Sequence, residues 1–529
     1  MARKPSLRVT NGQFIRDVFW FSTFTKLLLF SAYKSTDFEV HRNWLAITHQ
    51  LPVAQWYRES TSQWTLDYPP FFAWFEWVLS WFATWFDSGM LVLQATPYES
   101  PACTFYQRLT VLVTEQCLLY ALVRYTWGRK VFRDTHMGRV ITLLTFLNPG
   151  FYLVDHIHFQ YNAAMYGLLV LSIALMSEQR PLWAGMVFSV LLNFKHIYAY
   201  VAPAYFVYLL SGYCLGRDPV LALRKRTPSP WLETGWRLAK LGSLVSLVFA
   251  VSLGPFLYTN QLSQLITRLF PFKRGLCHAL WAPNFWALYS VGDRLLYHIV
   301  RSLGIWAQVK PTASMTRGIV GDVVFAVLPD ISPRATFILT VLVQLPGLVY
   351  LFRYPSRTNF IKCIVLSGFA SFLFGWHVHE KAYLLIVVPM ALLLTSGDIN
   401  LGRIFFLLNL AGVYGLFPLL HQPMETPLKL SITLLWVFGA RYGLKLDSSP
   451  ASPTAESSGS SCNTNWSWVV EGWYMWGFIC LQAYLGIIHS WVLGDNPSFE
   501  FLPILLTACY SAVGMVYVWV RFYIWFFLS

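Results

Sequence analysis

Four short polar motifs hold the residues best suited to chemistry in this 529-residue chain. They are LDYPP (Leu66–Pro70), DHIHFQYN (Asp155–Asn162), FPFKRGL (Phe270–Leu276) and HVHEK (His377–Lys381). Together the motifs offer carboxylates, imidazoles, lysines and an arginine. Such groups can take a proton from a hydroxyl and can bind a phosphate. The four motifs are therefore the candidate functional site.

Asp67 is the candidate general base. It precedes Tyr68, Pro69 and Pro70, and the two prolines fix the backbone and prevent a regular helix through the motif. A carboxylate on a stiff loop is well placed to accept a proton. The alternative is that Asp67 caps a helix that begins after the prolines. Glu76 is the nearest competing carboxylate, and its place in a Trp-rich run favours a structural role for it.

The second motif combines Asp155, His156 and His158 within four residues of sequence. This spacing suits a metal ion, a polar substrate pocket or packing at the end of a helix. A metal would need a third or fourth ligand that the sequence does not designate. A pocket that binds a polar substrate is the interpretation we favour.

The last two motifs contain cations and imidazoles. Arg274 follows Lys273 and precedes a glycine, so the pair could bind phosphate or could be solvated charges on a loop. His377 and His379 alternate with Val378, so an extended backbone would point both rings the same way. Burying polar residues beside a long apolar run costs free energy unless they are paired or functional. Binding a lipid-linked phosphate is a function that would fit these residues.

The elements that must position these motifs are membrane helices. Hydrophobic residues make up 56 % of the chain and charged residues only 12 %, against about 25 % in soluble domains. Mean hydropathy is +0.48. This composition excludes a soluble enzyme, a disordered chain and a collagen-like chain. The net charge of +14 follows the positive-inside rule for cytoplasmic loops and does not indicate a nucleic-acid partner.

The apolar runs predict an all-α polytopic protein with about 11–14 transmembrane helices of roughly 20 residues each. The first span, at about 18–32, should be uncleaved with its N-terminus in the cytoplasm. Basic loops at 129–139 and 217–240 should also be cytoplasmic. All four motifs then lie on the opposite side of the membrane. The aromatic stretch at 71–86 is typical of a helix in the membrane interface, and a short apolar run at 319–328 counts among the spans.

The chain divides into a membrane core at 1–446, a Ser-rich flexible loop at 447–467 and two closing transmembrane helices at 468–529. The eight cysteines form no CxxC motif, and most should be small buried hydrophobic residues. Cys103 and Cys277 are the two that fall in non-cytoplasmic loops, so a disulfide between them stays open.

The motifs LDYPP, DHIHFQYN, RLFPFKRGL, APNFW and HVHEK occur in this order, and the chain resembles the endoplasmic-reticulum α-1,3-glucosyltransferases that use dolichyl-phosphate glucose. These enzymes belong to the GT-C class of membrane glycosyltransferases. The segments WTLDYPPFFAWFEW and RGLCHALWAPNFWALYS resemble the member that adds the second glucose. The first-glucose enzyme is expected to have acidic and basic residues at 277–281. The resemblance covers residues 19–522.

The resemblance implies a GT-C helix bundle with luminal interfacial helices in the endoplasmic-reticulum membrane. It implies an inverting transfer of glucose from dolichyl-phosphate glucose to Glc1Man9GlcNAc2-PP-dolichol, with no cofactor and no metal. The implied catalytic base is Asp67. The expected contacts to the donor phosphate are Arg274, His377, His379 and Lys381. The expected substrate pocket is formed by Tyr68, Asp155, His156, His158 and Gln160.

Three other functions stay open. The chain could be the first-glucose enzyme, which acts on Man9GlcNAc2-PP-dolichol. It could be a transporter of a lipid or a lipid-linked sugar, although we detect no inverted repeat and expect all four motifs on one side of the membrane. It could also be a non-catalytic subunit of a larger transferase complex.

Overall fold

The computed structural model describes residues 10–128, 135–218, 220, 230–270, 275–278, 280–304, 324–446, 466–493, 496 and 499–528. Helices make up most of these residues, and the one isolated bridge between extended segments among them joins Cys277 to Val378. The chain forms two compact units. Unit 1 comprises Met1–Pro271, Leu345–Ser367 and Val388–Thr395, and unit 2 comprises Phe272–Gln344, Gly368–Val387 and Ser396–Ser529.

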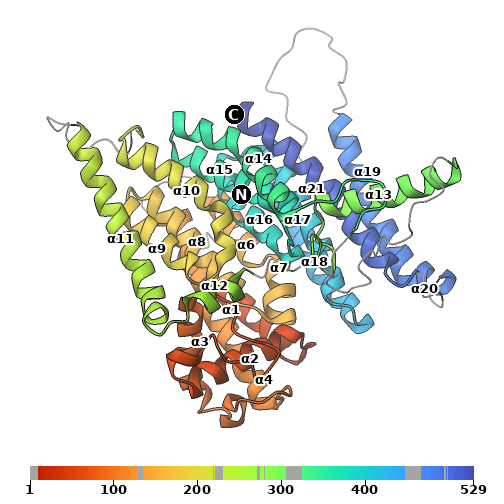
Figure 1. Ribbon diagram of the computed structural model, residues 1–529. Helices are drawn as coiled ribbons and strands as arrows, with labels where there is room; N and C mark the ends of the chain where they lie inside the picture. The colour runs from red at the N-terminus through yellow and green to blue at the C-terminus, as the bar shows by residue number, and fades with distance from the viewer. Residues whose placement is uncertain are drawn as a thin grey trace, which may run out of the picture. The chain divides into compact units, whose positions relative to one another are not determined.

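Unit 1 contains most of the N-terminal half of the chain (Figure 1). Its α-helices in chain order are α1 (Asn11–Leu27), α2 (Thr36–Gln50), α3 (Pro70–Ala83), α4 (Pro101–Thr114), α5 (Gln116–Trp127), α6 (Thr135–Phe146), α7 (Pro149–Phe151), α8 (Asn162–Ser177), α9 (Pro181–Leu192), α10 (Ala202–Tyr208), α11 (Pro230–Tyr258) and α12 (Leu262–Leu269). A π-helix, η5 (Tyr152–Phe159), continues α7.

The core of unit 1 forms where α8 packs against α5 and α9. A Cβ atom at Gly167 of α8 would lie 2.6 Å from the backbone nitrogen of Leu118 in α5. The glycine therefore lets the two helix backbones approach closely, as small residues do between membrane helices.

The helices that lie wholly in unit 2 are α13 (Phe285–Ser302), α17 (Ile399–Tyr414), α18 (Thr426–Gly443), α19 (Trp466–Ala483), α20 (His489–Val492) and α21 (Leu502–Leu528). Buried Glu471 of α19 ties three of them together. Its Oε2 accepts from Nε of Arg403 in α17 at 2.8 Å, and its Oε1 accepts from Nη1 of Arg521 in α21 at 2.7 Å. Pairing of this kind offsets the cost of charge inside a membrane helix.

Three helices have residues in both units: α14 (Pro333–Arg353), α15 (Arg357–Phe374) and α16 (Leu384–Leu393). The Ser-rich segment predicted as a linker lies largely outside the described residues. The two helices expected after it are present as α19 to α20 and α21. The three-part division of the chain itself stays a prediction.

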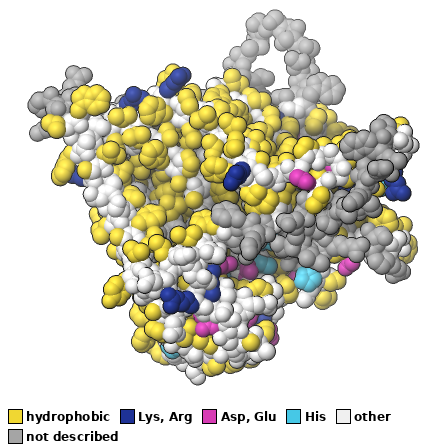
Figure 2. Space-filling model, in the orientation of Figure 1, with side chains coloured by type: hydrophobic (Ala, Val, Ile, Leu, Met, Phe, Trp, Pro, Cys, Tyr) yellow, Lys and Arg dark blue, Asp and Glu magenta, His cyan; other side chains and the backbone are white. Residues whose placement is uncertain are grey.

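Eight helical segments among the described residues are long and apolar enough to cross a membrane. They are His136–Phe159, His196–Cys214, Trp231–Tyr258, Pro333–Arg353, Arg357–Phe374, Ile399–Leu419, Ser467–Val492 and Leu502–Leu528. The predicted class, an all-α polytopic membrane protein, is confirmed. Figure 2 shows hydrophobic side chains over most of the face turned to the viewer. Exposed apolar residues such as Leu247 and Leu257 of α11 suit contact with lipid.

Two sequence expectations fail in detail. The apolar run at 319–328 is not helical over its described part, residues 324–328. The Asp293 carboxylate accepts hydrogen bonds at 2.8 Å from the backbone N–H groups of Ala326, Val327 and Leu328, which holds this segment as a loop. Cys103 and Cys277 are both free and buried, so the disulfide left open between them is not formed.

Candidate active site

The Asp67 loop of unit 1 is held by its backbone. The hydroxyl of Tyr57 donates to the carbonyl of Tyr68 at 2.6 Å. The indole N–H of Trp44 donates to the carbonyl of Thr65 at 3.1 Å. Just beyond the prolines, the N–H of Phe71 donates to the carbonyl of Asn193 at 3.0 Å. Hydrogen bonds thus anchor the chain on both sides of the carboxylate.

Aromatic packing adds to this anchoring. The Tyr68 ring packs against Trp44 and Phe72 with ring centroids 5.0 and 4.8 Å apart. Pro69 occupies the N-cap position of α3 and makes no side-chain cap bond. Asp67 is therefore not the N-cap residue of α3. Asp67 itself is half-buried, on a loop whose backbone is held on both sides.

The pKa of Tyr57 responds to two charged groups of this region, Asp67 and Arg268. Burial and then the Asp67 carboxylate raise the pKa of Tyr57, while Arg268 of α12 opposes them. The guanidinium of Arg268 donates from Nη2 to the carbonyl of Glu59 at 2.7 Å. A carboxylate, a phenol and a guanidinium thus share one region of unit 1.

Glu76, the competing carboxylate, has a structural environment. It is fully buried in α3, and its Oε1 lies 2.7 Å from Nδ1 of His41 in α2. Burial raises the pKa of Glu76. This enclosed position beside His41 supports the structural role predicted for Glu76.

Asp155 and His156 lie in the π-helix η5 and point into the protein. The two oxygens of Asp155 accept from Nδ2 of Asn162 at 2.8 Å and from the N–H of Ala163 at 2.6 Å. Asp155 therefore satisfies a donor in the first turn of α8. Nε2 of His156 lies 2.7 Å from Oε2 of Glu115, which also accepts from Nζ of Lys26 at 2.7 Å.

His158 and Gln160 point into a more accessible polar cluster. Nε2 of His158 lies 3.4 Å from Oδ2 of Asp37, and the amide of Gln160 donates to the same carboxylate. Lys195 donates to Oδ1 of Asn162 at 2.8 Å and lies 3.4 Å from Oε1 of Gln160. The same ammonium stands 5.0 Å from the centroid of the Tyr68 ring. Lys195 thus links the second motif to the Asp67 loop.

In unit 2, the HVHEK motif pairs with the segment 275–278. The N–H of His377 donates to the carbonyl of Leu276 at 3.0 Å, and its ring Nδ1 donates to the carbonyl of Gly275 at 2.8 Å. The backbone at His377 has a φ of 50°. The extended stretch predicted for His377 and His379 is therefore wrong at His377, because its two bonds to the other segment turn the chain.

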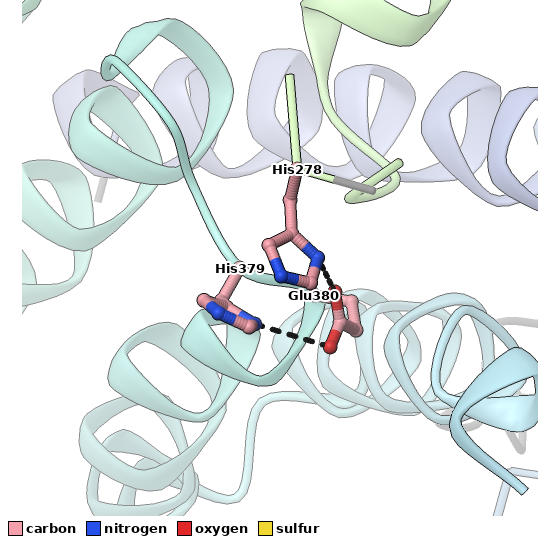
Figure 3. A group of neighbouring side chains, drawn as sticks. All are labelled: His278, His379 and Glu380. Atoms are coloured by element: carbon pink, nitrogen blue, oxygen red, sulfur yellow. Dashed lines mark hydrogen bonds and ion pairs between the residues drawn. The ribbon is translucent and has the colours of Figure 1, made fainter. Parts of the chain in front are cut away.

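A parallel bridge between Cys277 and Val378 places the next residues, His278 and His379, side by side. Their ring centroids are 3.6 Å apart. Nδ1 of His278 lies 3.3 Å from Oε2 of Glu380, and Nδ1 of His379 lies 3.3 Å from Oε1 (Figure 3). Burial alone would raise the pKa of Glu380, but His379 and His278 lower it well below its ordinary value. Glu380 is therefore a carboxylate.

Burial, and after it His278 and the Lys381 cation, lower the pKa of His379 to about 3, so this ring is neutral. Arg274, the other predicted phosphate contact, lies outside the described residues. The atoms of His278, His379 and Glu380 are also close enough together to hold a metal ion.

Comparison with known proteins identifies the family. Residues 22–522 match the model of the ALG6, ALG8 glycosyltransferase family. The chain belongs to this family. It is 45 % identical over 509 residues to a Neurospora crassa protein named dolichyl pyrophosphate Glc1Man9GlcNAc2 alpha-1,3-glucosyltransferase. The aligned region covers 96 % of this chain and 97 % of the relative.

Two further relatives bear the same name. The protein from Bos taurus is 44 % identical over 522 residues, with 96 % of this chain and 95 % of the relative covered. The protein from Schizosaccharomyces pombe is 42 % identical over 513 residues, with 96 % and 97 % covered. The predicted family and the glycosyltransferase class are confirmed.

For this ALG6/ALG8 family member, sequence reasoning gave no site role to three polar residues of the two clusters: Asp37, Lys195 and His278. Glu380 was included in the HVHEK motif, but without a role of its own. A signal existed for Lys195, which is a lone cation directly after an apolar helix. His278 stands in the segment RGLCHALW, but only its pairing with the HVHEK motif in the folded chain reveals a role.

Proposed function

We propose that this chain transfers glucose from dolichyl-phosphate glucose to Glc1Man9GlcNAc2-PP-dolichol and forms an α-1,3 bond. The observation that carries this proposal is the full-length similarity to relatives that bear the Glc1Man9GlcNAc2 alpha-1,3-glucosyltransferase name. The first-glucose reaction and transport are not favoured by these names. Neither a metal nor a cofactor is part of the proposal.

Asp67 is the general base of the proposed reaction. It accepts the proton of the acceptor hydroxyl, whose oxygen forms a bond to the anomeric carbon of the donor glucose. The bond from that carbon to the phosphate oxygen breaks, and its electron pair leaves with dolichyl phosphate. A single displacement inverts the anomeric configuration. The stiff, partly exposed loop supports this role, because a base must be positioned before it can act.

The departing phosphate gains negative charge, which cations stabilise. His377, His379, Lys381 and Arg274 are the proposed contacts to the donor phosphate. The positive charge of Lys381 near His379 supports this assignment.

The proposed substrate pocket contains Tyr68, His158 and Gln160, whose polar cluster includes Lys195. For Asp155 and His156 the pocket role also stays a prediction. Their buried partners support a positioning role, in which they hold the π-helix that carries His158.

We propose that the protein lies in the endoplasmic-reticulum membrane with a cytoplasmic N-terminus and luminal motifs. The basic loops of the sequence support this orientation. Single cysteines introduced beside Asp67 and beside Lys381 in a cysteine-free variant can be labelled in sealed microsomes. We expect both to react only after the membrane is permeabilised, and labelling from opposite sides would contradict the proposed orientation.

The function is tested with purified protein, dolichyl-phosphate glucose and two acceptors. We expect glucose transfer to Glc1Man9GlcNAc2-PP-dolichol and none to Man9GlcNAc2-PP-dolichol. Transfer to the Man9 acceptor alone would identify the first-glucose enzyme. Absence of transfer to either acceptor, with a properly folded protein, would contradict the proposal.

A further inference from the structure

The segment that leads to the Asp67 loop carries a polar hollow in unit 1. The hollow has a volume of about 390 Å³ and is lined by side chains with amide, guanidinium, carboxylate and hydroxyl groups: Gln55, Arg58, Glu59, Ser60 and Thr61. Sites that bind small molecules span roughly 300–1,000 Å³, so the 55–61 hollow is large enough to be one. The proposed reaction gives none of its lining residues a role.

The turn between α11 and α12 holds the backbone of the hollow. Gln261 accepts from the N–H of Tyr57 at 3.2 Å and donates to the carbonyl of Val53 at 2.8 Å. Arg58 donates from Nη2 to the carbonyl of Asn260 at 3.2 Å, so this lining side chain is also placed. The hollow is therefore formed before a ligand arrives, which lowers the entropy that binding would cost.

Glu59 and Arg58 give the hollow a charged acceptor and charged donors. Oε1 of Glu59 accepts from the N–H of Ser60 at 2.9 Å and from that of Thr61. Bonds from Thr61 and Ser60, and after them the Arg268 charge, lower the pKa of Glu59, so it is a carboxylate. Among the described residues, Arg58 donates from Nη2 alone, and a guanidinium carries five N–H donors.

This mixture of groups favours sugar hydroxyls over a phosphate as the ligand. The Glu59 carboxylate repels an ionised phosphate, which has no proton to donate to it. Each sugar hydroxyl both donates and accepts, so it can donate to the Glu59 carboxylate and accept from the Arg58 guanidinium. A neutral oligosaccharide is therefore the class of ligand that fits the hollow.

Arg268 of α12 connects the hollow to the proposed base. Its Nη2 donates to the carbonyl of Glu59 at 2.7 Å, and its charge interacts with the carboxylates of Glu59 and Asp67. Exposed charges are screened over about 8–10 Å, so a guanidinium that interacts with both carboxylates lies near both. Tyr57, whose hydroxyl donates to the carbonyl of Tyr68, joins the same two segments. A chain of sugars with one hydroxyl at Asp67 therefore has the hollow within its reach.

We propose that the 55–61 hollow binds mannose residues of the acceptor oligosaccharide beyond the reacting glucose. This inference rests on the proposed function, which supplies the acceptor and the base. Glu59 accepts from hydroxyls of these mannose residues and Arg58 donates to them. Arg268 is a positioning residue that holds the hollow beside Asp67. No bond is made or broken in the hollow, and binding a remote part of the substrate there helps to orient the reacting hydroxyl.

The binding test uses the full chain in detergent micelles and the free Glc1Man9GlcNAc2 oligosaccharide, which lacks the lipid and the pyrophosphate. The variants are Arg58→Ala and Glu59→Ala. Titration followed by NMR of the sugar protons should show about tenfold weaker binding for each, as expected when a hydrogen bond to a charged group is lost at a partly exposed site. The control, Arg16→Ala, removes an exposed cation of α1 and should bind as the wild type does.

The turnover test separates a sugar site from a merely structural role. With lipid-linked Glc1Man9GlcNAc2, both variants should raise the KM for the acceptor about tenfold, while the KM for dolichyl-phosphate glucose stays the same. With a synthetic acceptor that carries a single glucose on its lipid, the variants should match the wild type, because this acceptor has no mannose to place in the hollow. A segment that merely supports the Asp67 loop would lower turnover of both acceptors alike.

The loop geometry at Glu59 calls for a second variant. Glu59→Gln keeps the oxygen that accepts from Ser60 and Thr61 and removes the charge. If Glu59→Ala does not fold, as judged by gel filtration and thermal melting, Glu59→Gln and Arg58→Ala decide the question.

Two results would overturn the inference. One is a wild-type KM for the lipid-linked acceptor in folded Arg58→Ala. The other is binding of inorganic phosphate by the wild type that Arg58→Ala abolishes, which would make the hollow an anion site. If the wild type binds the free oligosaccharide but transfers no glucose to either lipid-linked acceptor, the proposed function fails, and the binding series still tests the sugar site on its own.

Discussion

The Asp67 loop and the His278–Glu380–His379 cluster are held in place by different forces. Around Asp67, several residues hold the loop through neutral hydrogen bonds to its backbone and through contacts between aromatic rings. Around the histidines, one buried carboxylate contacts both rings. A base on a shared scaffold should tolerate the loss of any one support, whereas the side-chain contact of both rings is lost when Glu380 alone is changed.

The largest effect should come from Asp67→Asn. The amide keeps the size of the side chain but cannot take a proton, and a positioned base contributes typically 10²–10⁴-fold. We expect turnover to fall by about that factor while the variant folds and binds dolichyl-phosphate glucose. Initial rates and donor binding by the purified variant measure this.

Glu76→Gln is the matched control for the base. It should lower thermal stability, because it disturbs the buried contact with His41, but the folded fraction should turn over normally. An active Asp67→Asn variant beside an inactive Glu76→Gln variant would move the base to Glu76.

The next effect should come from Lys381→Ala. Loss of a cation aimed at the leaving phosphate costs roughly 10² in rate, and we expect a fall in kcat of that order. Arg301→Ala, which removes an exposed cation of α13, is the control and should be neutral. Normal kcat for folded Lys381→Ala would remove it from the site. Arg274→Ala is expected to behave like Lys381→Ala.

A smaller loss should follow Lys195→Met, which keeps the length of the side chain and removes its charge. Lys195 bonds Asn162 and stands over the Tyr68 ring, and a hydrogen bond from a charged group contributes about 1.5–3 kcal/mol. We expect a drop of roughly tenfold or more in kcat/KM for the acceptor oligosaccharide. An unchanged value would show that the two motifs of unit 1 work independently.

The smallest effect should come from Tyr57→Phe, which tests whether several contacts together hold the Asp67 loop. The change deletes one neutral hydrogen bond to the carbonyl of Tyr68, which contributes about 0.5–1.5 kcal/mol. A lower melting temperature and a few-fold lower kcat are expected, and Tyr258→Phe at an exposed position should change neither. A loss as large as that of Asp67→Asn would mean that the loop depends on this single bond.

Sequence reasoning succeeded where one local property decides the structure. Long apolar runs become helices, and α3 begins at Pro70, directly after the loop that carries Asp67. It failed where the partner lies far along the chain. Glu115 cannot be recognised as the partner of His156 from either segment alone.

Sequence reasoning could not predict the positive φ of His377 for the same reason. His377 bonds Gly275 and Leu276 in this conformation, and a positive φ is uncommon at residues other than glycine. The pairing of His278 with His379 likewise needs the parallel bridge between their neighbours. The motifs could therefore be predicted as polar clusters, but the contacts within them could not.

The buried contact between Lys26 and Glu115 has a consequence for how the protein is made. Lys26 lies in α1 with no exposed surface, and Glu115 stands at the junction of α4 and α5. Lys26 is the second-last residue of α1, and a buried ammonium is costly until it has a partner. Because the ribosome makes Glu115 well after Lys26, we expect the end of α1 to reach its buried position late, once the segment that carries Glu115 has been made.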